Sequence, residues 1–148
     1  FQDHMERLYC STIPLQPGVQ EFLDEMLAKK VPMAVATATS RPLVEKVLTH
    51  HQLTSHFQSI TTVAEAGIGK HDPKVFLMAA DKLGMAPSRC IVFEDSLKAV
   101  LSAKTAGFDT IAIYEESNLS EQAALEAEAT LYIHDFVNLT ALHGKLFE

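Results

Sequence analysis

The second half of the chain contains the segment CIVFEDSLKAVLSAKTAG at residues 90–107. Its apolar start, Cys90 to Phe93, predicts a buried strand that ends at the acidic pair Glu94-Asp95. Ser96 can then cap a helix that Gly107 is placed to end in the left-handed conformation. One face of this helix carries small or apolar residues, namely Ala99, Val100, Ala103 and Ala106. A strand, an acidic turn and a helix with a small face predict an α/β unit whose helix lies close to a sheet.

The same alternation of strand and helix runs along the rest of the chain. Apolar runs predict further strands at 31–36, 57–63, 110–114 and 131–133. Helical periodicity and capping residues predict helices that begin at Pro17-Gly18, Ser40, Asp72-Pro73, Glu121 and after Asp135. The first of these helices has an apolar stripe that is expected to face a core, made of Val19, Phe22, Leu23, Met26 and Leu27. Together the elements predict an α/β fold with a parallel sheet covered by helices on both faces.

The composition is that of a globular domain with an acidic balance. The 148 residues are 47% hydrophobic, and 12 Lys and Arg against 19 Asp and Glu give a formal net charge of −7. Without a basic cluster that could neutralise a phosphate backbone, we expect no nucleic-acid partner. The two cysteines, Cys10 and Cys90, predict reduced thiols. With no export signal and no apolar run of membrane length, we expect a cytoplasmic protein with no membrane partner.

Side chains that could bind phosphate or a metal ion lie where two predicted strands end and in a glycine-lysine loop between these strands. Thr37 follows the run at 31–36, Lys70 follows Gly69, and Glu94-Asp95 follow the run at 90–93. The carboxyl ends of parallel strands meet at one edge of a sheet, so these groups can converge. A hydroxyl beside helix N–H groups and an ammonium group suit a phosphate oxygen, and adjacent carboxylates suit Mg²⁺. Taken singly, each residue also fits a purely structural role at a helix start or in a solvated loop.

The order and context of these motifs are similar to those of the haloacid dehalogenase superfamily. The matching series is Pro17-Gly18-Val19, Val35 to Thr39, Gly69-Lys70 with Pro73 and Phe76, and Val92 to Ser96. The nearest likeness is to the β-phosphoglucomutase-like branch of small phosphatases and sugar-phosphate mutases, although His71 and Lys74 stand where that branch usually has proline and aspartate.

This resemblance implies a three-layer, Rossmann-like core at 16–148, preceded at 1–15 by the remnant of a helical cap and a hinge. It gives catalytic roles to Thr37 and Lys70. It also implies that Ala38 joins these two residues in binding phosphate, and that Glu94 and Asp95 bind Mg²⁺.

One motif of that family is missing, because no Asp-x-Asp-Gly segment occurs anywhere in the chain. In the family it lies on a central first strand and supplies the nucleophile and the general acid and base. We therefore expect a core without its central strand, between the strands that end at Thr37 and at Glu94. An empty slot would leave buried backbone groups unpaired, at about 1 to 3 kcal/mol each. The slot must be filled by a missing N-terminal segment or a second chain, taken by another strand, or bypassed by closing the sheet.

The resemblance implies a Mg²⁺-dependent phosphatase that acts on a small phosphorylated metabolite through an aspartyl phosphate. Without the nucleophile, this chain alone is predicted to be inactive. Two alternatives stay open, a non-catalytic remnant that binds Mg²⁺, phosphate or a partner chain, and the core of a sugar-phosphate mutase. A phosphoacceptor receiver domain uses similar residues, but it needs its acidic pair early, whereas here the order is Thr37, Lys70, Glu94-Asp95.

Overall fold

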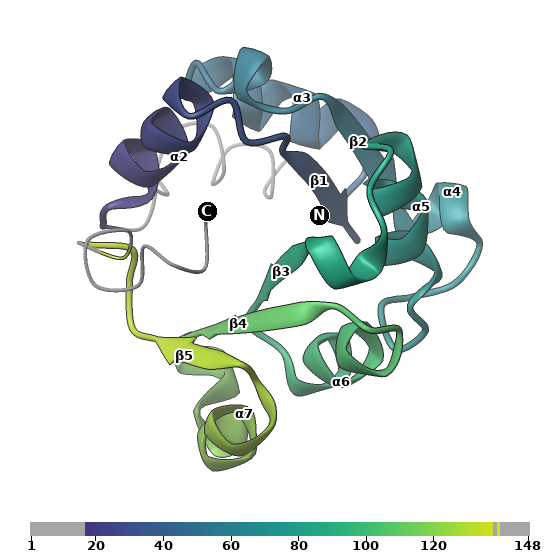
Figure 1. Cartoon of the computed structure of the whole chain (residues 1–148), viewed down its shortest axis with the longest axis vertical. Helices are drawn as coiled ribbons and strands as arrows, with labels where there is room; N and C mark the ends of the chain where they lie inside the picture. The colour runs from purple at the N-terminus through teal and green to yellow at the C-terminus, as the bar shows by residue number, and fades with distance from the viewer. Residues whose placement is uncertain (1–16, 138, 140–148) are drawn as a thin grey trace. The chain divides into compact units, whose positions relative to one another are not determined.

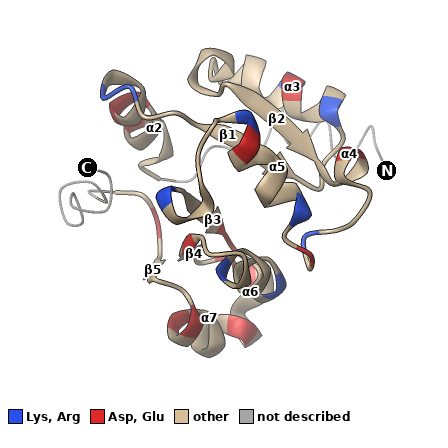
Figure 2. Cartoon of the chain, turned by 45° about the vertical axis from the view of Figure 1, so that its right-hand side comes forward, with Lys and Arg blue, Asp and Glu red and all other residues tan. Residues whose placement is uncertain are grey.

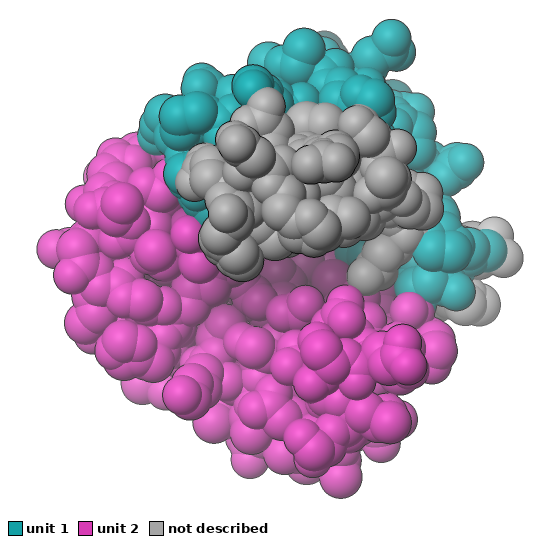
Figure 3. All heavy atoms as spheres, turned by 180° about the vertical axis from the view of Figure 1, so that it is seen from behind, with its two compact units in different colours: residues 1–33, 39–58, 135–148 teal, residues 34–38, 59–134 magenta. Residues whose placement is uncertain are grey.

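The computed structural model describes residues 17–137 and residue 139. The chain divides into two compact units, coloured separately in Figure 3: one comprises residues 1–33, 39–58 and 135–148, and the other comprises 34–38 and 59–134. The predicted cap remnant and hinge at 1–15 lie outside the described residues, as does most of the helix expected after Asp135.

The described strands all belong to the second unit and pair in parallel (Figure 1). One sheet consists of β1 (Ala34–Thr37) and β2 (Ser59–Thr62). The other contains, in order, β3 (Ile91–Glu94), β4 (Asp109–Ile113) and β5 (Leu131–Ile133). The parallel α/β class is therefore confirmed. Within the described part of the chain no ladder joins β1 to β3, the position at which the family resemblance places a further strand.

Helices pack on both sheets of this unit. They are α4 (Val63–Ala66), α5 (Lys74–Lys82), α6 (Leu97–Thr105) and α7 (Gln122–Glu128), with short 3₁₀ turns η3 (Pro87–Arg89) and η4 (Glu116–Glu121). Helix α5 packs on β1 and β2, α6 packs on β3 and β4, and α7 packs on α6. Ala99 and Ala103 of α6 are fully buried, so the predicted small face does lie against the core.

A single apolar cluster joins α5 to α6. Val75, Phe76 and Ala80 from α5 meet Ala99 and Ala103 from α6, together with Phe108. Ala36 of β1 and Val92 of β3 pack against the same cluster. One core therefore holds both of the strands whose ends carry predicted site residues. The rings of Phe76 and Phe108 lie edge to face, with centroids 6.3 Å apart.

Several predicted boundaries in this unit were wrong by one to three residues, among them the limits of β2, β3 and β4. The strand predicted from residue 31 begins at Ala34, because Pro32 has no N–H to give to a ladder. Val63, predicted as strand, begins α4, since the hydroxyl of Thr62 accepts a capping bond from Glu65 N at 3.1 Å. Helix α5 begins at Lys74, after Pro73.

The first unit contains α2 (Val19–Ala28), α3 (Arg41–His50) and η2 (Thr54–His56). Phe22 and Met26 of α2 are buried as predicted, but Leu27 is 41% exposed, so the predicted stripe is too wide. Leu27 lies about 100° around the helix from Met26, which places it at the margin of the apolar face. His56 is buried, and its Nε2 lies 2.7 Å from Asp24 Oδ1 on α2.

Helix α2 starts at a glycine that no other residue could replace without strain. Gly18 has φ +82°, a region that L side chains rarely adopt. A Cβ atom at this position would lie 2.5 Å from the backbone carbon of Phe136 and from the backbone nitrogen of Val137. The chain therefore needs glycine here for both its conformation and its close backbone approach.

Candidate functional site

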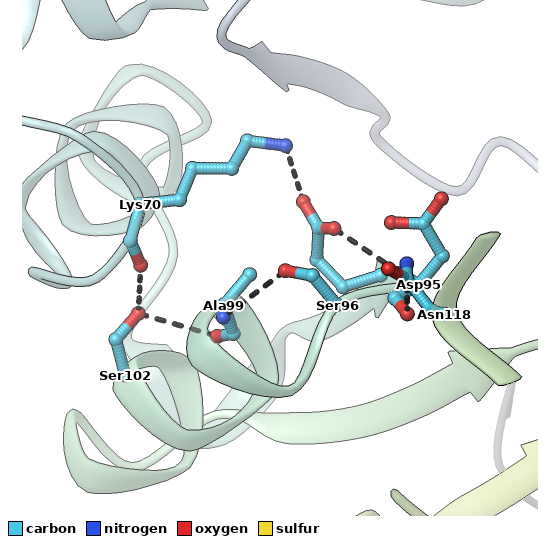
Figure 4. Close-up of polar contacts among 7 residues, drawn as sticks. Lys70, Asp95, Ser96, Ala99, Ser102 and Asn118 are labelled. Carbon is cyan, nitrogen blue, oxygen red and sulfur yellow. Dashed lines mark hydrogen bonds and ion pairs between the residues drawn. The ribbon is translucent and has the colours of Figure 1, made fainter. Parts of the chain in front are cut away.

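An ion pair joins two of the predicted site residues. Lys70 Nζ, in the loop before α5, donates to Glu94 Oε2 at the end of β3 (Figure 4). The Glu94 side chain is only 9% exposed and that of Lys70 is 24% exposed, so the pair is largely shielded from water. Lys and Arg residues are spread over several helices and loops of the described chain (Figure 2). The partner of Lys70 is a buried carboxylate, whereas Glu65 and Glu128, the partners of Lys82 and Lys104, are more than a third exposed.

The strand-to-helix turn fixes the direction of the Glu94 carboxylate. Its second oxygen, Oε1, accepts from the backbone N–H of Asp95 at 3.1 Å. Ser96 then caps α6, with its hydroxyl oxygen accepting from Ala99 N at 3.3 Å, as the sequence predicts. Both oxygens of Glu94 therefore have protein partners, and the carboxylate is held in place before any ligand is bound.

Asp95 lies next to this pair in an environment with an excess of negative charge. Burial raises the pKa of the Asp95 carboxyl above its usual range, and the charges of Glu94 and Glu115 raise it further, while Lys70 acts in the opposite direction. A half-buried carboxylate whose negative neighbours outnumber its positive ones is stabilised by an added cation. Asp95 is the residue of this group that fits a metal ligand best.

The segment after β4 braces the Asp95 turn from a second side. Asn118 Nδ2, in η4, donates to the backbone oxygen of Asp95 at 3.0 Å. Glu121 Oε1 accepts from Leu97 N, in the first turn of α6, at 3.1 Å. Sequence reasoning missed both residues, because they lie more than 20 positions away in a polar stretch and only the fold brings them to the turn.

The Lys70 loop is fixed by a turn and by helix α6. Asp72 N donates to the backbone oxygen of Gly69 at 3.1 Å, which closes a tight turn around Lys70. The Lys70 ammonium lies 5.9 Å from the centroid of the Phe76 ring, within cation–π range. The hydroxyl of Ser102, on α6, donates to the backbone oxygen of Lys70 at 2.6 Å. This contact of Ser102 was not predicted from the sequence either.

The hydroxyl candidate Thr37 stands at the carboxyl end of β1, where the sequence places it. Thr37 pairs in register with Thr62, the last residue of β2. Ala38 follows as an exposed residue, and Ala36 packs against the cluster that contains Phe76. The role of Thr37 and Ala38 in binding phosphate stays a prediction, as do the roles of Lys70 and the acidic pair.

The donors for a metal ion are fewer than a complete protein cage would need. Among the described residues, no group of three or more His, Cys, Asp or Glu side chains is arranged to hold a metal ion. Mg²⁺ commonly keeps several waters and binds one or two carboxylates together with phosphate oxygens. Asp95 and its neighbour Glu94 therefore fit part of such a shell.

In the same described part of the chain, no helix combines the length and the apolar character that crossing a membrane requires.

The fold and this site define a class: parallel α/β proteins with polar and charged side chains where the strands end, which is the edge at which proteins of this class bind ligands. The model of the family "haloacid dehalogenase-like hydrolase" matches residues 1–113. The chain belongs to this family, and the resemblance drawn from its motifs is confirmed.

Relatives with known activities support the same branch. The phosphorylated carbohydrates phosphatase of Thermotoga maritima is 29% identical over 131 residues, which cover 88% of this chain and 61% of the relative. Hexitol phosphatase B of Escherichia coli is 35% identical over 104 residues, covering 69% of this chain and 46% of the relative. The chain thus spans only part of the length of the relatives it matches.

Solved structures agree. A putative β-phosphoglucomutase from Thermotoga maritima has a TM-score of 0.83 at 27% identity, covering 97% of this chain and 66% of that one. CbbY from Rhodobacter sphaeroides, solved in complex with phosphate, has a TM-score of 0.81 at 27% identity, covering 90% of this chain and 60% of that one. The Rossmann-like core is therefore confirmed.

Proposed function

We propose that this chain is the phosphate- and Mg²⁺-binding core of a phosphatase that acts on a small phosphorylated metabolite. The observation that carries the proposal is the Lys70 ammonium held by the buried Glu94 carboxylate, with Asp95 next in the chain, at the end of a parallel strand. The phosphatases of phosphorylated carbohydrates and hexitols among its relatives support the same class of substrate.

In this proposal each residue has a separate task toward the phosphoryl group. Lys70 binds an equatorial oxygen, and its charge stabilises the negative charge that spreads onto these oxygens in the transition state. Glu94 keeps the ammonium group in place between turnovers. The Thr37 hydroxyl and the Ala38 backbone bind a second oxygen.

Asp95, with Glu94 beside it, would hold the metal. Bound Mg²⁺ would supply the positive charge that offsets repulsion between a carboxylate nucleophile and the phosphate. Asn118 and Glu121 keep the backbone of this turn fixed, so that the carboxylate does not have to reorganise when the cation binds.

The nucleophile has to come from outside the 148 residues, because they contain no Asp-x-Asp-Gly segment. We propose that a strand with this segment, from a missing N-terminal segment or a second chain, inserts between β1 and β3. Its first aspartate would attack phosphorus while the bond from phosphorus to the ester oxygen of the metabolite breaks, and its second aspartate would give that leaving oxygen a proton. Water would then hydrolyse the aspartyl phosphate, which releases inorganic phosphate and restores the carboxylate. The chain by itself is then inactive.

Complementation tests the proposal. The purified chain is assayed with p-nitrophenyl phosphate and Mg²⁺, alone and with a synthetic peptide that carries a strand ending in Asp-x-Asp-Gly. We expect turnover only with the peptide, its loss in Lys70→Ala, and its retention in Lys104→Ala, where the lysine pairs with Glu128 on an exposed surface. Turnover by the pure chain that Lys70→Ala abolishes would contradict the predicted inactivity. A peptide that binds but never restores turnover would favour the non-catalytic alternative.

Mutase activity is the second candidate, favoured by the structural likeness to a putative β-phosphoglucomutase. The complemented chain separates the two activities. A phosphatase releases inorganic phosphate from a sugar phosphate, whereas a mutase moves the phosphoryl group to another hydroxyl of the sugar. A cytoplasmic location also belongs to this proposal, in agreement with Cys90 as a free thiol.

A further inference from the structure

A buried hydroxyl on α6 makes an unexpected bond. Ser102 is 6% exposed, and its Oγ lies 2.6 Å from the backbone oxygen of Lys70 and 3.2 Å from that of Ala99 (Figure 4). A carbonyl oxygen only accepts, so the single hydroxyl proton serves both contacts, and the shorter distance shows that it points mainly at Lys70. The loop that carries the proposed catalytic lysine is thus tied to a helix 32 positions away in the chain.

A serine inside a helix commonly either points to solvent or bonds back to a carbonyl of the preceding turn. Thr105, one turn further along α6, does the latter, since its hydroxyl donates to Leu101 O at 2.8 Å on the exposed side. For Ser102 the equivalent local bond, to Ala99 O, is the longer of its two contacts. The hydroxyl is therefore directed out of its own helix and toward the lysine loop.

Helix α6 consequently carries both halves of the site. Its N-terminal cap follows Glu94-Asp95 directly, and about 9 Å along its axis Ser102 holds the backbone of Lys70. The helix lies on β3 and β4, with Ala99 and Ala103 fully buried. It therefore connects the turn that carries the acidic pair to the backbone of Lys70.

We propose that Ser102 is a positioning residue, which acts through Lys70 by fixing the backbone from which the ammonium group reaches the phosphate. This proposal rests on the proposed function, because it gives Lys70 the task of binding phosphate. It predicts that loss of the Ser102 hydroxyl weakens phosphate binding and leaves Mg²⁺ binding by Asp95 unchanged. If Ser102 were needed only for folding, Ser102→Ala would lower the affinities for phosphate and for Mg²⁺ together.

The experiment measures binding of inorganic phosphate in the presence of Mg²⁺, and of Mg²⁺ alone, by calorimetry on the full chain. For Ser102→Ala we expect phosphate affinity to fall about 3- to 10-fold, the size of one hydrogen bond, with Mg²⁺ affinity within about twofold of the parent. Ser102→Thr, which keeps the hydroxyl, is expected to restore phosphate affinity. Thr105→Ala is the matched control on the same helix and is expected to change neither value.

A double variant separates the two proposals. Lys70→Ala is expected to lower phosphate affinity about tenfold or more, and adding Ser102→Ala to it should lower it no further. If Lys70→Ala binds phosphate as well as the parent does, the proposed function fails. If Lys70→Ala weakens binding but Ser102→Ala does not, only the positioning role of Ser102 fails. Additive losses in the double variant would equally overturn that role.

A measurement without phosphate tests the role of Ser102 whether or not Lys70 binds phosphate. Reductive ¹³C-methylation of the lysines gives an NMR signal for Lys70, assigned by its absence in Lys70→Arg. We expect Ser102→Ala to move this signal, because the ammonium group loses its fixed approach to Glu94, and we expect Thr105→Ala to leave it in place. An unmoved Lys70 signal in Ser102→Ala would overturn the positioning role.

Discussion

Replacing Lys70 by methionine removes the ammonium group that pairs with Glu94 among the described residues, while the aliphatic volume is largely kept. Glu94 then stays in a site where its side chain is 9% exposed, and one of its oxygens loses its charged partner. Breaking a buried ion pair in this way costs about 3 to 5 kcal/mol. Lys70 is 24% exposed and Glu94 keeps its bond from Asp95 N, so water and the backbone recover part of this cost. We expect the free energy of unfolding to fall by about 2 to 3 kcal/mol.

The surface pair of Lys104 and Glu128 gives the matched control. Its atoms lie 2.9 Å apart but both side chains are about half exposed, so Lys104→Met is expected to cost about 1 kcal/mol or less. The double variant Lys70→Met with Glu94→Gln should recover about 1 to 2 kcal/mol relative to Lys70→Met, because it removes the uncompensated buried charge.

Urea unfolding followed by far-UV circular dichroism measures these differences, since the chain has no tryptophan. Equal slopes of the unfolding free energy with urea are required before midpoints are compared. A Lys70→Met variant that loses no more stability than Lys104→Met would refute the reasoning, because the pair would then behave like one on the surface.

Three further predictions concern other parts of the chain. Gly18→Ala should cost about 3 kcal/mol or more, because the added Cβ meets backbone atoms at 2.5 Å, whereas Gly84→Ala, with a similar positive φ and open space, should cost about 1 to 2 kcal/mol in the same urea assay. The bond from His56 lowers the pKa of Asp24, so the stability it gives is present above the unfolded pKa of about 4 and is lost as the pH falls through the lower folded value. Asp24→Asn should therefore be less stable than the parent at neutral pH, with the difference vanishing in strong acid; a difference that persists there would contradict the assignment. Burial and nearby carboxylates raise the pKa of Asp95, so its ionised form destabilises the fold once the pH exceeds about 4. Asp95→Asn should gain thermal stability near neutral pH without metal but lose stabilisation by millimolar Mg²⁺; undiminished Mg²⁺ stabilisation would argue against Asp95 as a ligand.

The alternation of elements was predictable because it depends on local patterns. The strand before Glu94, the cap at Ser96 and the left-handed glycine at 107 are each specified by a few neighbouring residues, and the structure has all three. Two strand boundaries were predicted wrongly because a nearby residue favoured a different local structure. The Thr62 hydroxyl capped a short helix before the predicted strand could continue, and Pro32 delayed the start of another strand.

Part of the candidate site was predictable as well. Residues that follow strands of a parallel sheet must lie at one edge, which is why Glu94 and Asp95 could be selected from the sequence. That Lys70 would bond to Glu94, with neither of the Glu94 oxygens left without a protein partner, was not predictable. It depends on the direction in which a loop and a strand end present their side chains.

By itself, the sequence determined the class of fold, the residue types at the strand ends and the absence of an Asp-x-Asp-Gly nucleophile, because each of these is written in a short run of neighbouring residues. Only the tertiary structure decided which distant groups support them. Ser102 reaches the Lys70 backbone, and Asn118 holds the Asp95 turn, from positions more than 20 residues away. A hydrogen bond requires two atoms within about 3 Å, and spacing along the chain does not set that distance until the helices have packed on the sheet.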